Sequence, residues 1–158
     1  MAKKTYNEKL QNSKDLPKVE FIGYDDQMAK RFGSGNMLIA APIQYDEAMK
    51  KIPKGKLTTS IEIRDYLAKQ HHADFTCQLT AGIFINVAAN ASEERENQGS
   101  TDITPYWRTL KKDGELNEKY PGGIEGQKAL LEAEGHEITK KGKRYFVKNY
   151  EEAIHKLD

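Results

Sequence analysis

The amino-acid sequence predicts a mainly α-helical domain with a small β component, and three observations predict this class. The chain has 158 residues, which is enough for one domain with a buried core and no need of disulfides. Apolar residues recur at helical spacing within residues 45–52, 60–67 and 75–91. Towards the C-terminus, a Lys141-Gly142 turn between two strand-like runs predicts a hairpin over residues 136–148.

The chain begins with a polar segment. Residues 1–36 are rich in lysine and weakly periodic, and the Gly-Ser-Gly-Asn stretch at 33–36 has the composition of a loop. We therefore expect residues 1–36 to form a polar N-terminal tail and docking segment, and the helical domain to occupy residues 37–135.

Two amphipathic helices are predicted next. The apolar residues of 45–52 fall at i, i+3, i+4 and i+7, and Pro53 ends this first helix. Thr59 and Glu62 have the spacing of a capping box, in which each side chain accepts a hydrogen bond from the backbone N–H of the other residue. A second helix should therefore begin near Ser60.

The third helix is predicted over residues 75–91, which are apolar nearly all round, with Leu79 and Ile83 four residues apart. This pattern is typical of a buried helix. Residues 92–102 are polar and predict a connection, and residues 103–110 are expected to be mainly extended because they contain a proline.

The C-terminal region is predicted to contain two further helices around the hairpin. A Pro-Gly-Gly turn at 121–123 precedes a helix over 124–134, and Gly135 stands where a left-handed cap belongs. Asn149 is expected to cap a last helix. Residues 136–158 should therefore form a C-terminal hairpin and helix packed on the same domain.

Composition excludes several classes of function. The formal net charge is only +1, so no overall basic excess indicates a nucleic-acid partner. Cys77 is the sole cysteine, and no Cys/His spacing predicts a metal site. The sequence has no apolar run long enough to cross a membrane. We expect a cytoplasmic protein that uses no metal and no cofactor.

Three blocks of residues carry a resemblance to a known family. They are Ile-Pro-Lys-Gly-Lys-Leu-Thr-Thr at 52–59, Thr-Pro-Tyr-Trp-Arg-Thr at 104–109 followed by Asp-Gly-Glu-Leu at 113–116, and Tyr-Pro-Gly-Gly at 120–123 followed by Lys-Ala-Leu-Leu at 128–131 and Glu-Gly at 134–135. In order and spacing they resemble the DNA-binding domain of the alkylguanine-DNA alkyltransferases, also called methylated-DNA-protein cysteine methyltransferases. The resemblance implies a helix-turn-helix domain of winged-helix-like form.

The resemblance also implies that the family's chemistry is lost. The nucleophilic cysteine and its activating histidine correspond to Tyr106 and Trp107 in this chain. A phenol with a pKa near 10 is a poor substitute for a thiolate, so we expect no catalytic residue. In this respect the chain is most similar to the shorter alkyltransferase-like proteins, which lack the catalytic cysteine.

DNA-binding positions follow from the same resemblance. Lys54 and Lys56, at the turn before the second helix, are expected either to contact phosphates or only to form an exposed basic turn. Thr59 and Ser60 begin that helix, with Ser60 standing where the family has a tyrosine that presses on a phosphate. The family's base-flipping arginine lies nearest to Gln78 here.

That arginine has no counterpart on the third helix. No arginine occurs between Asp65 and Glu94, and Cys77 or Gln78 at its position could only fill space or form hydrogen bonds. The sequence therefore offers no evident residue to fill the gap that an extruded base leaves in the duplex.

A base pocket is expected where the family has its active site, formed by Pro105, Tyr106, Trp107, Arg108, Tyr120, Gly122 and Gly123. Tyr106 and Trp107 would either stack on an extruded base or simply fill the vacated space. Arg108 is expected to brace the site through hydrogen bonds.

Three hypotheses of function result. The first is a non-catalytic protein that binds duplex DNA, recognises alkylated guanine for DNA repair and works with a repair protein. The second is a degenerate alkyltransferase fold that binds a protein or a small ligand without DNA, which the near-neutral charge favours. The third is alkyl transfer through Cys77, against which its apolar neighbours argue.

Overall fold

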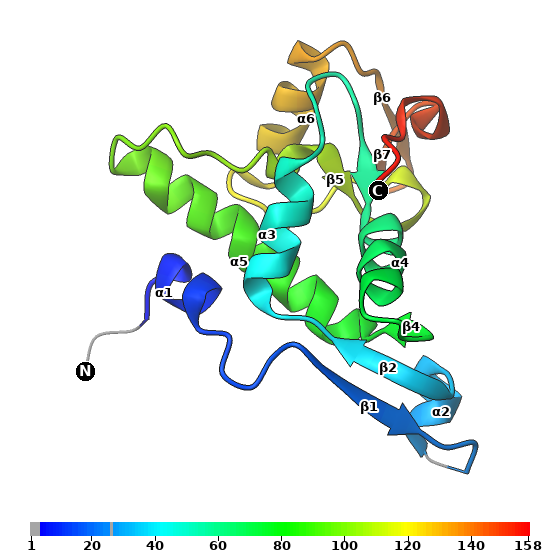
Figure 1. Ribbon diagram of the computed structural model, residues 1–158. Coiled ribbons are helices and arrows are strands. Elements are labelled where there is room, and N and C mark those ends of the chain that lie inside the picture. Colours follow the sequence, from blue (N-terminus) through cyan, green and yellow to red (C-terminus); the bar gives the residue numbers. More distant parts are fainter. Residues whose placement is uncertain (1–3, 26) are drawn as a thin grey trace.

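The computed structural model describes residues 4–25 and 27–158, and it confirms a mainly α-helical protein with a small β component (Figure 1). The α-helices are α1 (Tyr6–Gln11), α2 (Gln27–Phe32), α3 (Pro42–Lys50), α4 (Ser60–Gln70), α5 (Gln78–Asn97) and α6 (Gly123–Ala133). The strands are β1 (Lys18–Ile22), β2 (Gly35–Ile39), β3 (Thr58–Thr59), β4 (Phe75–Thr76), β5 (Thr109–Leu110), β6 (Ile138–Lys141) and β7 (Arg144–Val147). Short 3-10 helices lie at Tyr106–Arg108, Lys112–Gly114 and Tyr150–Ala153.

The long helix α5 is the axis of the main core. It has 20 residues, so it is about 30 Å long at 1.5 Å per residue. Ala81, Ala88 and Ala89 are fully buried on it, and these small side chains let α3 and α1 pack closely. Tyr45 of α3 and Ile63 of α4 are buried against the same cluster.

The N-terminal segment, predicted to be a polar tail and docking segment, contains a helix, α1, that packs on α5. α1 begins at a cap in which Thr5 Oγ1 accepts from the backbone N–H of Glu8, 3.0 Å away. Leu10 of α1 is buried in the main core, while Asn7 Nδ2 donates to the carbonyl of Ala91 on α5 at 2.9 Å. Docking on α5 therefore organises residues whose polar composition predicted a tail.

A small sheet crosses the predicted boundary at residue 36. Its order is β1-β2-β4, with β1 antiparallel and β4 parallel to β2. Gly35 and Asn36 belong to β2, where they lie opposite Ile22 and Phe21 of β1. The composition of residues 33–36 predicted a loop, but pairing with a distant strand holds half of that stretch extended.

Helices α3 and α4 begin as local signals require. α3 begins at Pro42, earlier than predicted, because proline is well suited to the first turn and Gln44 Oε1 accepts from Ala41 N–H at 2.8 Å. α4 begins at Ser60 as predicted, and Thr59 Oγ1 accepts from the backbone N–H of Glu62 while its hydroxyl donates to the Glu62 carboxylate. This N-cap at Thr59 thus fixes where the α4 helix starts.

Helix α5 corrects the prediction for residues 75–102 in two ways. It begins at Gln78, because Phe75 and Thr76 pair with β2 as strand β4. It continues to Asn97, because its last turns have partners inside the protein: Ser92 Oγ donates to the carbonyl of Thr104 at 3.2 Å. The predicted connection over 92–102 is therefore mostly helix.

The C-terminal region contains the predicted hairpin, β6-β7, but a 3-10 helix at Tyr150–Ala153 replaces the predicted last α-helix. The chain instead runs beside the segment before β3, where the N–H of Leu57 donates to the carbonyl of Ala153 at 2.9 Å. A second aliphatic core fills the space between the hairpin and α6; it contains Leu57, Leu110, Leu116, Leu131 and Val147.

Of the helices that the structure describes, none has the length and apolar character to cross a membrane.

Candidate nucleic-acid interface

A short parallel strand pair brings two of the motif blocks together. Thr58 and Thr59 of β3 lie opposite Thr109 and Leu110 of β5. The start of α4, immediately after β3, is therefore held beside the segment that follows the family-like residues 104–109. This pairing creates the wall of a groove.

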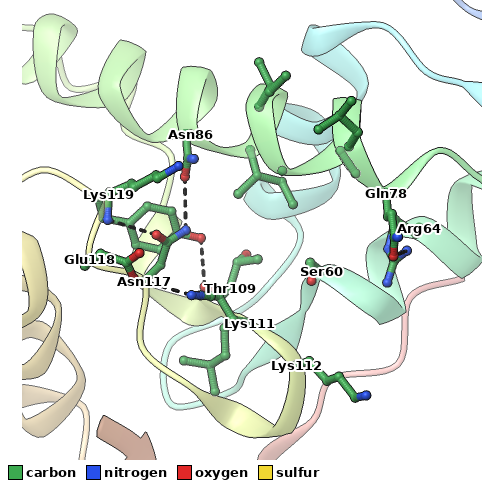
Figure 2. Close-up of a pocket in the computed structure, with 17 residues that line it drawn as sticks. Ser60, Arg64, Gln78, Asn86, Thr109, Lys111, Lys112, Asn117, Glu118 and Lys119 are labelled. Carbon is green, nitrogen blue, oxygen red and sulfur yellow. Dashed lines mark hydrogen bonds and ion pairs between the residues drawn. The ribbon is translucent and has the colours of Figure 1, made fainter. Parts of the chain in front are cut away.

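The groove lies between α4, the N-terminal half of α5 and residues 109–120, and its volume is about 500 Å³ (Figure 2). Its polar and charged lining consists of Ser60, Arg64, Gln78, Asn86, Thr109, Lys111, Lys112, Asn117, Glu118 and Lys119. Of the predicted DNA-binding residues, Ser60 and Gln78 are thus in the groove.

Positive charge dominates this lining. Arg64, Lys111, Lys112 and Lys119 stand against the single carboxylate of Glu118. Lys111 is partly neutralised, since its Nζ lies 3.4 Å from Glu118 Oε2. Lys112 and Lys119 are exposed, and neither forms an ion pair within residues 4–25 and 27–158. Lysines arranged in this way are suited to a polyanion such as a nucleic-acid backbone.

Arg64 was missed by the sequence reasoning, which searched for an arginine only on the third helix. It projects from α4 to the start of α5, where its Nη1 donates to Gln78 Oε1 at 3.5 Å (Figure 2). Arg64 and Gln78 also line a second, smaller pocket of about 170 Å³ with Arg31 of α2. The sequence did contain a signal for Arg64: it follows Ser60 by four residues, which places both side chains on the same face of α4.

Apolar side chains of α5 complete the groove. Leu79 is 56% exposed and Ile83 is 51% exposed, whereas the sequence predicted a helix buried on all sides. Gly82 lies between them and is also exposed. The prediction was wrong for this half of α5 because period alone does not distinguish a core face from a binding face.

The wall formed by residues 109–120 is fixed by hydrogen bonds around Asn117. Its Nδ2 donates to Asn86 Oδ1 on α5 at 3.0 Å (Figure 2). Its backbone N–H donates to the buried Gln127 Oε1 at 2.7 Å. Tyr120 Oη donates to the carbonyl of Thr109 at 2.8 Å. The polar surface of this wall is therefore held in place before any ligand arrives.

The aromatic residues expected to form a base pocket pack on one another instead. The Tyr106 ring lies 5.4 Å from that of Trp107 and 5.3 Å from that of Tyr120, with interplanar angles of 85° and 70°. Tyr106 is only 6% exposed and belongs to the main core. Burial raises its pKa to about 12, so it is a neutral phenol at ordinary pH.

Among the predicted base-pocket residues, Tyr120 alone lines the groove. Pro105, Tyr106, Trp107, Arg108, Gly122 and Gly123 are outside its lining. Of the two roles expected for Tyr106, stacking on a base or filling the vacated space, its burial favours the second, because a side chain that is 6% exposed offers little of its face to a base.

Arg108 has a structural role behind this aromatic cluster. Its Nε and Nη2 donate to the carboxylate of Glu134 at 2.9 and 2.6 Å, and its Nη1 donates to the carbonyl of Ile52 at 2.7 Å. Burial alone would raise the pKa of Glu134, but the hydrogen bonds and charge of Arg108 outweigh it and hold the pKa below its ordinary value. The pair connects three of the family-like blocks.

Gly122 and Gly123 form the turn that starts α6. Gly122 has a φ of +79°, and a Cβ atom there would lie 3.1 Å from the Cα of Gly126. Both facts make glycine the residue that this turn requires. The turn starts α6, and neither of its glycines lines the groove.

Two lysines and a threonine of the predicted interface lie elsewhere. Lys54 and Lys56 are exposed on a turn closed by the Lys56 N–H to Pro53 carbonyl bond of 3.0 Å, and neither lines the groove. Thr59 is buried as the cap of α4. The predicted phosphate contact of the two lysines is thus separate from the groove.

Cys77 lies immediately before α5 and is 6% exposed, packed with Ile22 and Met37. It is not among the residues that line the groove. Over the stretches of chain that the structure describes, no group of His, Cys, Asp or Glu side chains could hold a metal ion.

Comparison with known proteins gives structural similarity only. A scan against models of protein families found no match, and no curated protein sequence matches. Among solved structures, the chain is similar to S. pombe Atl1 in complex with damaged DNA containing O6-carboxymethylguanine, at 22% identity and a TM-score of 0.49. It is also similar to S. pombe ATL in complex with DNA, at 21% identity and a TM-score of 0.46. Each match covers 73% of this chain and 94% of the other.

Proposed function

We propose that this protein binds duplex DNA through the groove between α4, α5 and residues 109–120. The observation that carries the proposal is the lining of that groove, in which four cations face one carboxylate on a protein whose net charge is only +1. Positive charge concentrated on one face supplies the phosphate contacts of a nucleic-acid binder even when the whole molecule is nearly neutral. The family-like blocks at 52–59 and 104–135 support the same function.

In this proposal α4 and α5 serve as a helix-turn-helix, with α5 as the helix that faces the bases. Gln78 and Arg64 stand together at its exposed end, 3.5 Å apart. Arg64 would supply from the neighbouring helix the guanidinium that α5 lacks. A planar guanidinium can hold a phosphate in a bidentate manner or occupy space between bases.

The proposed function involves no alkyl transfer. The phenol of Tyr106, with a pKa of about 12, has almost no anionic form at neutral pH, and its ring is buried. Cys77 is buried outside the groove. A protein of this kind would hold a modified duplex rather than repair it, and recognition of alkylated guanine on behalf of a repair protein is the finer function that we propose.

Fluorescence anisotropy with short labelled duplexes at several salt concentrations tests DNA binding. Two double variants remove the same charge: Lys112→Gln/Lys119→Gln in the groove, and Lys54→Gln/Lys56→Gln on the distant turn. Each lost phosphate contact reduces the slope of log affinity against log salt by about 0.9. We expect the groove variant to lower the slope by nearly twice that amount and the turn variant to leave it unchanged.

Other outcomes would redirect the proposal. A lowered slope in the turn variant alone would place the phosphate contacts at Lys54 and Lys56. Absence of binding to any duplex at low salt would contradict the DNA-binding function and favour the protein or small-ligand hypothesis. Duplexes with and without O6-methylguanine then decide whether the protein prefers the modified base.

A further inference from the structure

The groove-facing side of α5 carries two exposed aliphatic side chains, Leu79 and Ile83. Leu79, Gly82, Ile83 and Asn86 have the spacing i, i+3, i+4 and i+7, so they form one stripe along the helix, and all four line the groove. Ile85, which also borders the groove, is only 3% exposed and packs in the core. The exposed aliphatic pair therefore does not belong to the core of the monomer.

Gly82 is a second, independent sign that this stripe meets a ligand. A glycine within a helix lowers its stability, and it is usually kept where space is limited. Here no atom lies within 4 Å of the position that a Cβ would occupy, so the fold itself leaves room for a side chain. A ligand that approaches the backbone of α5 between Leu79 and Ile83 would need that room.

The surroundings of the stripe identify the class of ligand. Arg64, Lys112 and Lys119 line the same groove, so an apolar protein surface would have to leave these cations without partners. A nucleic-acid duplex offers both kinds of surface: phosphates at the rims of its grooves, and sugars and base edges inside them. Aliphatic side chains that enter a duplex groove commonly insert between stacked base pairs and unstack them.

We propose that Leu79 and Ile83 form an apolar wedge that enters the duplex and separates two stacked base pairs, while the lysines and arginine of the groove hold the flanking phosphates. The inference rests on the proposed DNA-binding function and adds the residues that distort the DNA. α5 can act as a wedge because its position is fixed, by the core on one side and by the Asn86 to Asn117 hydrogen bond on the other. Gly82 allows its backbone to come close.

A duplex that carries 2-aminopurine at its central step reports the separation, because this base becomes brighter when it is unstacked. Binding is followed by anisotropy and unstacking by 2-aminopurine emission, both at saturating protein. We expect the wild-type protein to raise the emission several-fold. The Leu79→Ser/Ile83→Ser variant should lose most of this rise and keep its salt slope, and its melting temperature should fall only slightly, because about half of each side chain is exposed.

Two further variants keep the test specific. Lys112→Gln/Lys119→Gln should bind more weakly but give the full emission rise once saturated. Gly82→Ala should raise the melting temperature, since alanine favours a helix, and should reduce the emission rise. Binding without an emission change, or an unchanged rise in the serine variant, overturns the wedge alone. Absence of any duplex binding overturns the proposed function together with it.

Discussion

The Arg108–Glu134 pair shows how single residues join the sequence blocks. Both side chains are mostly buried, at 13% and 8% exposure, and the guanidinium holds the carboxylate through two donors. The carbonyl of Ile52 accepts a third hydrogen bond from Arg108. The Arg108 side chain therefore connects the segment before the Lys54 turn to Glu134, at the end of α6. The pair should therefore contribute to stability and not to ligand chemistry.

Replacing Glu134 by glutamine tests this role. The pKa of Glu134 is lower in the folded protein than its ordinary value of 4.5, so its stabilising effect is complete above pH 4.5 and disappears as the pH falls through the folded-state value. At pH 7 we expect Glu134→Gln to lower the free energy of unfolding by about 3 kcal/mol, the lower end for a broken buried pair.

Urea unfolding of both proteins at pH 7 and in acid measures the effect. The difference between them should shrink in acid, where the wild-type carboxylate is itself protonated. Equal differences at both pH values would show that glutamine disturbs packing and that the ion pair adds nothing.

At the scale of residues, short-range signals could be read from the sequence and long-range ones could not. Thr59 and Glu62 predicted the start of α4, and Gly135 predicted the end of α6, because each depends on neighbours a few positions away. Arg64 was not recognised, because its meeting with Gln78 depends on how α4 and α5 pack. The burial of Tyr106 likewise depends on distant partners.

Helix α4 supplies an element whose start can be tested. Thr59 Oγ1 accepts from the backbone N–H of Glu62, and the residue after Thr59 lines the groove. Replacement by valine keeps the shape of the side chain and removes the oxygen. We expect Thr59→Val to lower the free energy of unfolding by about 1 kcal/mol, the usual effect of a lost cap, whereas Thr59→Ser should be nearly neutral.

Hydrogen exchange of the Glu62 amide checks the origin of this effect. It should become faster in Thr59→Val and stay slow in Thr59→Ser. If Thr59→Val is neutral and Thr59→Ser loses stability, the methyl group and not the hydroxyl is the important feature of Thr59.

The element least well predicted was α5. Its apolar residues have helical period, which correctly indicated a helix, but period cannot say that Leu79 and Ile83 are exposed while Ile85 is buried in the core. Its first and last turns depended on β4 and on Thr104, which the sequence did not link to it. The length of α5 and the exposure of its side chains were therefore predicted wrongly, because both depend on tertiary contacts.

On the scale of the whole molecule, the two halves of α5 have different tasks. Its N-terminal half lines the groove, and its C-terminal half holds α1 (Figure 1). Asn7 is the main link, with Nδ2 donating to Ala91 and Glu94, and Oδ1 accepting from Arg95 Nη1 at 2.7 Å. Docking of α1 should therefore be separable from ligand binding.

Asn7→Ala tests that separation. The variant loses three side-chain bonds to α5, so we expect faster amide exchange across α1 and a free energy of unfolding lower by about 3 kcal/mol, at roughly 1 kcal/mol for each lost bond. Affinity for duplex DNA should stay unchanged. A parallel loss of affinity would mean that α1 positions the groove after all.

The sheet β1-β2-β4 is the feature of the overall architecture that the sequence concealed. β2 pairs in parallel with β4, a strand of two residues that follows α3 and α4 in the sequence. No local sequence pattern therefore predicts this pairing. The mainly α class, the hairpin and α6 were predictable because adjacent residues form them.

The aromatic cluster has a practical meaning for experiments in solution. Trp107 is the only tryptophan in the chain, and it packs between the Tyr106 ring and the guanidinium of Arg108, outside the groove lining. Its emission should therefore follow unfolding of the protein faithfully. Two sets of contacts connect Trp107 to the groove wall: Gln127 bonds both Trp107 and Asn117, and the Tyr106 ring contacts both Trp107 and the groove residue Tyr120. A change in Trp107 emission on adding DNA would therefore report that the wall behind the groove has shifted.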